Sequence, residues 1–187
     1  MAVYHVKMQH TEKTFELLSR KQYDLFCGTN RIVRTLLSVV CLYFGATNFE
    51  QWWGILLTAY GCFQMTNIYA QPNYTARKLA QQIRERGMSF PASEYTFRKN
   101  YMEIKVLPER EDEENEHLKY KDLEKLGEDA NYFYLFRNQY GGYMVPKEQL
   151  SGRVDEFRSF LEKSTGQICH AKTAPWIKMI RKLSSRK

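Results

Sequence analysis

The chain has 187 residues, of which 43% are hydrophobic and 26% are charged, and its formal net charge is +7. This length excludes a large multidomain enzyme, and this balance of apolar and charged residues excludes disorder over most of the chain. The four cysteines are widely spaced, without the pattern of a zinc site or of a disulfide framework, so no metal site is predicted. The apolar residues are concentrated in one stretch, because Glu50 is the only charged residue between Thr35 and Ala76.

Residues 1–30 are predicted to form a strand, Val3–Met8, and a helix, Glu12–Phe26, on the cytoplasmic side of a membrane. Charged residues are spread through this segment, so no apolar core of a signal peptide fits within it. Its apolar surface is too small for a separate domain. We therefore expect it to pack on a later part of the chain.

Residues 31–71 are predicted to form a transmembrane helical hairpin. The apolar segments Ile32–Phe49 and Trp52–Ala70 are each close to the roughly 17–25 residues of a membrane-spanning helix. Few residues separate them, so the two helices would be antiparallel. The charge-free part of the first segment is short, and Arg34 would have to extend its guanidinium group toward the lipid headgroups. The alternative is a buried helical hairpin in a water-soluble core.

Basic residues flank this hairpin at both ends, whereas the loop between its helices carries only Glu50. The positive-inside rule then places both termini in the cytoplasm and the loop outside, as in a multi-pass protein of the cell membrane. We expect the nearest basic residues to contact an anionic lipid surface. These candidate membrane-surface residues are Arg31, Arg34, Arg77 and Lys78.

Small or modest side chains recur at every fourth position of the second apolar segment. On a helix they form one stripe, which allows a second helix to approach closely within lipid. Gln64 and Asn67 are polar at membrane depth and need a partner across a helix interface. Packing of the two helices of one chain explains the stripe, and so does a homo-oligomer or a larger membrane protein complex. The candidate helix-packing residues are Gly54, Thr58, Cys62, Thr66 and Ala70.

Residues 72–89 are predicted to form a basic juxtamembrane helix, and residues 90–166 a domain of short antiparallel strands. The helix Arg153–Lys163 closes this domain, with Phe157 and Leu161 on its apolar face. The predicted strands are Glu94–Arg98, Tyr101–Leu107, His117–Tyr120, Tyr132–Arg137 and Gly142–Val145.

Residues 167–187 form a basic amphipathic tail, in which Thr173–Lys187 is predicted to be a helix lying on the membrane surface. The tail contains no acidic residue after Gly166, so its bases would all be attracted to anionic lipid. The alternatives are a helix packed on the strand domain, a frayed end, or a helix docked in an acidic groove of a partner. The candidate membrane-surface residues of the tail are Trp176, Lys178, Arg181 and Lys182.

Several motifs follow one another between Tyr95 and Leu161. They include the aromatic–x–Asp–aliphatic step Tyr120–Leu123, the aromatic run Tyr132–Phe136 and the tripeptide Val145–Lys147. In this order the motifs resemble the YcxB-like family of bacterial membrane proteins, in which the first aromatic residue is usually Trp. The resemblance implies a membrane α+β fold, with a two-helix transmembrane hairpin and a small antiparallel strand domain closed by a C-terminal helix. Such a strand domain is similar to a pleckstrin-homology domain, and the resemblance implies no defined activity.

The sequence contains no pattern typical of catalysis. Its histidines do not accompany a nucleophile and a carboxylate, and Gly141–Gly142 lies in a predicted hairpin turn rather than at the start of a phosphate-binding helix. The basic excess lies beside the hairpin and in the tail, which argues against nucleic-acid binding by the strand domain. We therefore expect a membrane-anchored, non-enzymatic interaction module on the cytoplasmic face, without a cofactor. The alternatives are an accessory or regulatory subunit of a membrane transport or self-immunity complex, and a membrane enzyme with an unrecognised site.

Overall fold

The computed structural model describes residues 4–107 and 116–170, and at positions 71–73 and 75 it describes the backbone alone. The chain divides into two compact units. One, the strand domain, consists of the chain up to Thr11 together with the chain from Ser89 onward, and the other, the helical unit, is Glu12–Met88. The chain is therefore an α+β protein, as expected. The segment 1–30 is divided between the two units, since its strand joins the strand domain and its helix joins the helical unit.

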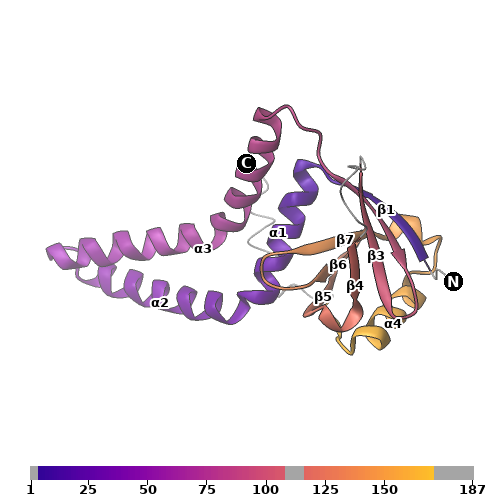
Figure 1. Ribbon diagram of the computed structural model, residues 1–187. Helices are drawn as coiled ribbons and strands as arrows, with labels where there is room; N and C mark the ends of the chain where they lie inside the picture. Colours follow the sequence, from indigo (N-terminus) through magenta and orange to yellow (C-terminus); the bar gives the residue numbers. More distant parts are fainter. Residues whose placement is uncertain (1–3, 108–115, 171–187) are drawn as a thin grey trace. The chain divides into compact units, whose positions relative to one another are not determined.

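The first sheet of the strand domain has four antiparallel strands in the order β1-β2-β3-β4 (Figure 1). Val6 lies opposite Tyr95, and Tyr95 lies opposite Ile104. All three side chains are buried, because alternate residues of each strand face the core. The strands are β1 (Tyr4–Gln9), β2 (Ala92–Phe97), β3 (Tyr101–Leu107) and β4 (Glu116–Lys119), and the predicted bounds of β3 are confirmed.

The second sheet has the order β7-β6-β5-β8, in which β8 is parallel to β5 and the other pairs are antiparallel. The strands are β5 (Lys125–Glu128), β6 (Tyr132–Phe136), β7 (Gly142–Pro146) and β8 (Cys169–His170). Short 3₁₀ helices, η1 (Tyr120–Asp122) and η2 (Lys147–Leu150), precede β5 and follow β7, and helix α4 (Val154–Thr165) comes next. Neither β5 nor β8 was predicted. Both are short, and β5 contains a glycine between charged ends, so the two strands depend on pairing rather than on local propensity.

Phe157 of α4 lies at the centre of the strand-domain core. It is fully buried, and its ring centroid lies 4.9 Å from those of Tyr4 and Phe97 and 5.2 Å from that of Phe133. These rings come from β1, β2 and β6, so one helical residue joins both sheets. Helix α4 and the aromatic strand β6 therefore share one core.

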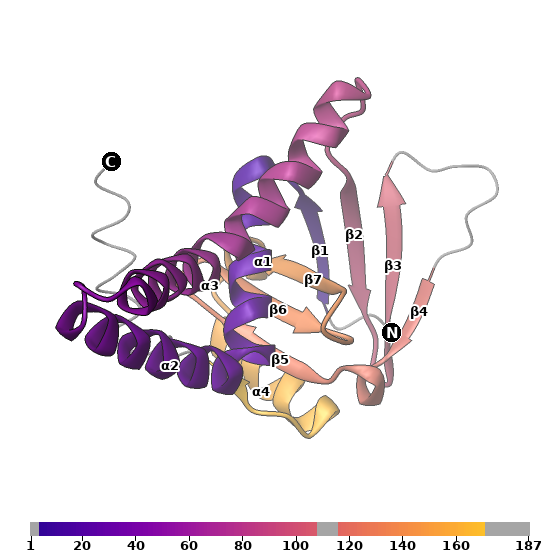
Figure 2. The same cartoon turned by 90° about the vertical axis from the view of Figure 1, so that its left-hand side faces the viewer.

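The helical unit consists of α1 (Glu12–Phe26), α2 (Gly28–Thr47) and α3 (Trp52–Glu85). The bounds predicted for α1 are confirmed. Helix α3 runs without a break through the predicted second apolar segment and most of the predicted juxtamembrane helix. Figures 1 and 2 show that α3 bends part-way along its length, and it contains Pro72, a residue type that removes a helical hydrogen bond and bends the axis.

The first part of α3 pairs with α2 as an antiparallel hairpin, and its later part packs on α1 (Figure 2). Two ion pairs join α1 to α3: Glu16 with Arg77 at 2.7 Å, and Glu12 with Arg84 at 2.6 Å. Among the described residues, no single helix combines the length and the apolar character of a membrane span. Helices α1 and α2 meet that test only when taken together, and their axes differ by 82° at the break between them.

Candidate functional site

The interface between α2 and α3 is lined by small side chains at seven-residue intervals. These are Ser38 and Gly45 on α2, and Gly54 and Gly61 on α3, all of them buried. A Cβ atom added at Gly54 would lie 1.9 Å from the carbonyl oxygen of Asn48, and one added at Gly45 would lie 2.8 Å from that of Gly54. The two backbones therefore approach each other so closely that a larger residue at either glycine would push them apart.

The outward surface of this hairpin consists of large apolar side chains, which we call the apolar belt. Leu36 is 62% exposed, Phe63 is 63% exposed and Trp52 is 71% exposed. In water, large apolar side chains are normally buried and contiguous exposed patches of them are rare. The hairpin has the opposite arrangement. The belt also contains Ile32, Val33, Leu37, Val39, Val40, Tyr43, Phe44, Phe49, Trp53, Ile55 and Leu56.

The predicted stripe of helix-packing residues leaves this interface part-way along α3. Gly54 is buried and Thr58 is half-buried beside Gly45 of α2. A four-residue step advances about 400° around a helix, so the stripe turns about 40° away with each repeat, whereas a seven-residue step remains nearly in line. The interface within the chain therefore uses only the first two residues of the stripe. The remaining three, Cys62, Thr66 and Ala70, are exposed.

Arg31 does not lie on the surface of the helical unit, which corrects the expectation that it contacts lipid headgroups. It is 4% exposed, and its Nη1 donates a hydrogen bond of 2.6 Å to Oδ1 of Asp24. Its guanidinium carbon lies 5.2 Å from the ring centroid of Tyr69 and 5.8 Å from that of Tyr23. Because Asp24 belongs to α1 and Arg31 to α2, the ion pair fixes the bend between these helices.

The other predicted membrane-surface residues of the hairpin, Arg34, Arg77 and Lys78, are exposed. Arg77 is also paired with Glu16, and their contact raises the pKa of its guanidinium group. The tail residues Trp176, Lys178, Arg181 and Lys182 lie outside the described part of the chain.

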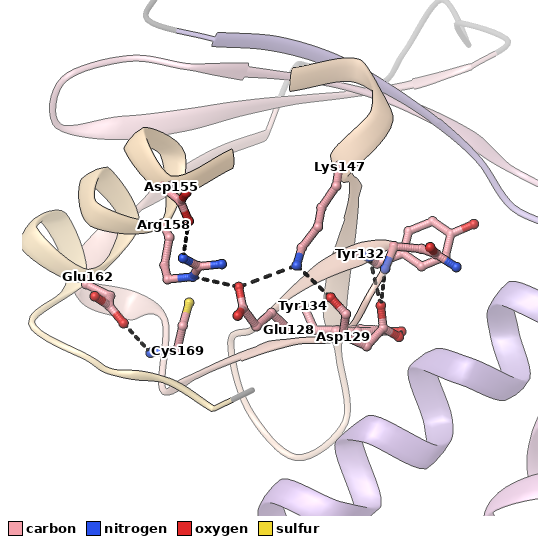
Figure 3. Close-up of polar contacts among 10 residues, drawn as sticks. Glu128, Asp129, Tyr132, Tyr134, Lys147, Asp155, Arg158, Glu162 and Cys169 are labelled. Atoms are coloured by element: carbon pink, nitrogen blue, oxygen red, sulfur yellow. Dashed lines mark hydrogen bonds and ion pairs between the residues drawn. The ribbon is translucent and has the colours of Figure 1, made fainter. Parts of the chain in front are cut away.

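A cluster of polar side chains surrounds the β5–β6 turn of the strand domain (Figure 3). Oδ1 of Asp129 accepts hydrogen bonds from the backbone N–H groups of Asn131 and Tyr132, at 2.9 and 2.8 Å. Oδ2 of Asp129 accepts one from the Tyr134 hydroxyl at 2.5 Å. Nζ of Lys147 donates to the Asp129 carbonyl oxygen at 2.6 Å, and its backbone N–H donates to the Asn131 carbonyl oxygen at 2.8 Å. Lys147 therefore holds this turn through both its side chain and its backbone.

Glu128 connects the same turn to helix α4 (Figure 3). Its carboxylate, only 9% exposed, lies 2.9 Å from Nε of Arg158 and 3.6 Å from Nζ of Lys147. A buried carboxylate requires compensating positive charge, and here the two cations Arg158 and Lys147 supply it. Oε1 of Glu162 accepts a hydrogen bond of 2.8 Å from the backbone N–H of Cys169, which attaches β8 to α4.

Burial determines which groups of this cluster exchange protons. Burial raises the pKa of the Tyr134 hydroxyl, and the hydrogen bond to Asp129 raises it further, so the phenol remains a donor. Burial also raises the pKa of the Cys169 thiol to about 12, and the charge of Glu128 adds to this effect. At neutral pH the thiol is therefore protonated and is a poor nucleophile. The contacts of this cluster position β5, β7, β8 and α4 relative to one another.

The motifs singled out in the sequence hold turns of the strand domain. The Tyr120 hydroxyl donates a hydrogen bond of 2.6 Å to the carbonyl oxygen of Arg98, and its ring centroid lies 5.5 Å from that of Phe160. Leu123 and Val145 are buried in the core. Lys147, the last residue of the tripeptide motif, holds the β5–β6 turn.

Sequence reasoning missed the ion pair of Asp24 with Arg31 and the ion pair of Glu128 with Arg158. The second joins residues 30 positions apart, and no local pattern indicates it. The first had a signal, because Asp24 and Arg31 are seven positions apart and continue the seven-residue spacing of Ser38 and Gly45.

Residues 102–161, from β3 to α4, match the family model described as YcxB-like protein. This segment contains the Tyr120 turn, the aromatic strand β6 and Lys147. No curated protein and no solved structure matches the chain. This part of the strand domain, which carries the motifs recognised in the sequence, is therefore similar to the YcxB-like family.

Proposed function

We propose that this protein is a membrane-anchored interaction module, in which the α2–α3 hairpin spans the membrane and the strand domain lies on the cytoplasmic face. The observation that carries the proposal is the distribution of side-chain size in the hairpin. Small residues such as Gly45 and Gly61 are inside, and the large apolar residues of the belt are outside. Lipid chains solvate such a surface, and close packing of small residues holds helices together within lipid.

The mean hydropathy of α2 is reduced by residues that would not face lipid. Arg31 is buried and paired with Asp24, and Ser38 and Gly45 face α3. The side chains that would contact lipid are therefore more apolar than the average over the helix. With 20 residues and about 1.5 Å per residue, α2 is about 30 Å long. About 20 Å of this length follows Arg34, so Arg34 would have to extend its guanidinium group to the lipid headgroups.

Charge supports an orientation with both termini in the cytoplasm. The exposed bases Arg34 and Lys78 lie at the end of the hairpin away from its loop, and the loop carries only Glu50. Since the axes of α1 and α2 differ by 82°, a membrane-spanning α2 would leave α1 nearly parallel to the membrane plane. Arg34 and Lys78 would then contact anionic headgroups, each contributing about 1 kcal/mol.

The strand domain has two sheets and a helix, α4, that follows all of their strands except the short β8, which supports a likeness to a pleckstrin-homology domain. Such a likeness identifies no ligand, because one fold serves many functions. We propose that its surface binds a protein partner without catalysis. Tyr140 is one candidate contact, because it is 84% exposed at the tip of the β6–β7 turn. Oδ1 of Asn138 accepts hydrogen bonds from the backbone N–H groups of Tyr140 and Gly141, which makes this tip rigid.

Membrane insertion is tested by alkaline carbonate extraction and density flotation of the full-length protein. Val40→Lys places a charge in the apolar belt, and it should reduce the membrane-bound fraction strongly, since Lys at mid-membrane costs about 3 kcal/mol. Val106→Lys is the matched control, because Val106 is similarly exposed but lies in the strand domain. Extraction of the wild-type protein by carbonate, or equal behaviour of the two variants, would refute the membrane anchor.

Orientation and partner binding need separate measurements. In a cysteine-free background, Gln51→Cys should react with an impermeant maleimide from outside intact cells, and Lys99→Cys only after permeabilisation. Partner binding is tested by purification in mild detergent followed by mass spectrometry. A partner bound through Tyr140 should be lost in Tyr140→Ala and kept in Tyr140→Phe. Labelling of Lys99→Cys in intact cells would contradict the orientation.

A further inference from the structure

The apolar belt is interrupted on one flank of α3 by a hydrogen-bonded polar pair. Nε2 of Gln64 donates a hydrogen bond of 2.8 Å to the hydroxyl of Tyr60, which is 45% exposed. The half-buried Asn67 lies on the same flank, one turn further along the helix. This flank is separate from the interface with α2, which follows Gly54 and Gly61.

The pair lies deep in the membrane if the hairpin spans it, so this inference rests on the proposed function. Along the helix axis, Tyr60 lies about 12 Å beyond Trp52, and Gln64 lies about 18 Å beyond Trp52. The hydrocarbon core is about 30 Å thick. No water is available there to complete the hydrogen bonds of either side chain.

Each side chain of the pair retains unused hydrogen-bonding capacity. The Tyr60 hydroxyl accepts from Gln64, and its own proton remains to be donated. The carbonyl oxygen of the Gln64 carboxamide remains an acceptor, and no described residue donates to it. One flank of one helix therefore presents a donor and an acceptor side by side.

We infer that this flank binds the same flank of a second copy of the chain within the membrane. In a twofold-symmetric pair, Tyr60 of each copy donates its hydroxyl proton to the Gln64 carbonyl oxygen of the other. Two symmetry-related hydrogen bonds then satisfy the Tyr60 donor and the Gln64 acceptor of both copies. A surface that carries both the donor and the acceptor is complementary to itself. A partner with only apolar side chains would leave both groups unsatisfied in hydrocarbon.

The test measures the mass of the full-length protein in detergent micelles by light scattering, over a range of protein-to-detergent ratios. The wild-type protein should form a dimer. Gln64→Leu should weaken the dimer about tenfold, because it removes two symmetry-related hydrogen bonds, and Tyr60→Phe should do the same. Thr66→Val is the matched control, since Thr66 lies about 160° around the helix from Gln64 and its hydroxyl bonds to the Cys62 carbonyl of its own helix.

Disulfide crosslinking gives a second, positional readout in bilayers, using a background in which the four native cysteines are replaced by serine. Tyr60→Cys should form a crosslinked dimer on oxidation and Thr66→Cys should not. A monomer at every ratio, or equal crosslinking at both positions, would overturn the inference. Carbonate extraction of the same samples separates the two proposals. Protein that stays in the membrane as a monomer refutes only the dimer, whereas protein that is extracted refutes the membrane anchor and the dimer together.

Discussion

The strand domain and the hairpin bury opposite kinds of side chain. In the strand domain the largest residues are inside: Phe97 and Phe133 both contact Phe157, and none of the three is exposed. In the hairpin the innermost residues include Gly45 and Gly61, and the large residues are outside. Under the membrane-anchor proposal, this difference reflects the surroundings of each segment: water favours large apolar side chains inside, and lipid accepts them outside.

The largest expected effect tests the strand-domain half of this comparison. Phe157→Ala removes the ring that joins both sheets to α4, and it should destabilise the strand domain by about 3–5 kcal/mol. Its melting temperature, followed by circular dichroism in detergent, should fall by about 10 °C or more. Ser159→Ala, an exposed change on the same helix, should leave melting nearly unchanged. Equal melting of the two variants would show that Phe157 is not central to the core.

The next effect concerns a polar contact of the same domain. Lys147→Met removes the hydrogen bond to the Asp129 carbonyl and one of the two cations beside Glu128, which should cost about 1.5–3 kcal/mol. Lys121→Met is the control, because Lys121 is exposed in η1. Thermal melting of both variants measures the difference. If Lys121→Met is as unstable as Lys147→Met, the contacts of Lys147 with Asp129 and Glu128 do not stabilise the domain.

The hairpin half of the comparison is tested by enlarging an inner residue. Gly45→Val inserts atoms where an added Cβ would lie 2.8 Å from the backbone of both Gly54 and Thr58, and it should cost about 1–3 kcal/mol. Unfolding by sodium dodecyl sulfate titration measures the loss of hairpin stability. Gly28→Ala is the control, since an added Cβ there meets nothing within 4 Å. If Gly45→Val matches the control, the helices do not approach each other as closely as described.

The smallest effect is a pH dependence that belongs to the strand domain alone. Burial lowers the pKa of His10 below its ordinary value of 6.5. Between 6.5 and the lowered pKa the unfolded chain binds more protons than the folded chain, so the free energy of unfolding falls as the pH falls through this window. The melting temperature at pH 7.5 should exceed that at pH 5.5 by more in the wild-type protein than in His10→Asn. An equal difference in both proteins would exclude this role of His10.

The sequence predicted the elements whose local pattern is strong. The bounds of α1 and β3 were correct, because each has a clear periodicity and a turn signal at its end. The strand β5 was missed, since four residues with charged ends and an internal Gly127 have no strand preference of their own. The second apolar segment and most of the predicted juxtamembrane helix form one continuous helix, because α3 continues through Pro72.

The candidate sites were harder to predict than the elements. Of the predicted stripe from Gly54 to Ala70, only Gly54 and Thr58 lie in the interface with α2, because that interface follows a seven-residue spacing. Arg31 was assigned to the membrane surface because its sequence neighbours are basic, and its seven-residue spacing from Asp24 was overlooked. Ion pairs between distant residues are products of folding, so composition and spacing do not reveal them.

The discontinuous strand domain has a consequence for the order of events during synthesis. The side chain of Gln9 donates a hydrogen bond to the Phe90 carbonyl, although the two residues are 81 positions apart. At about 5–20 residues per second, roughly 4–16 s separate the synthesis of the two. During that interval β1 has no strand to pair with, while the whole hairpin is produced. Under the membrane-anchor proposal, translation therefore gives the hairpin time to insert before the strand domain is able to close.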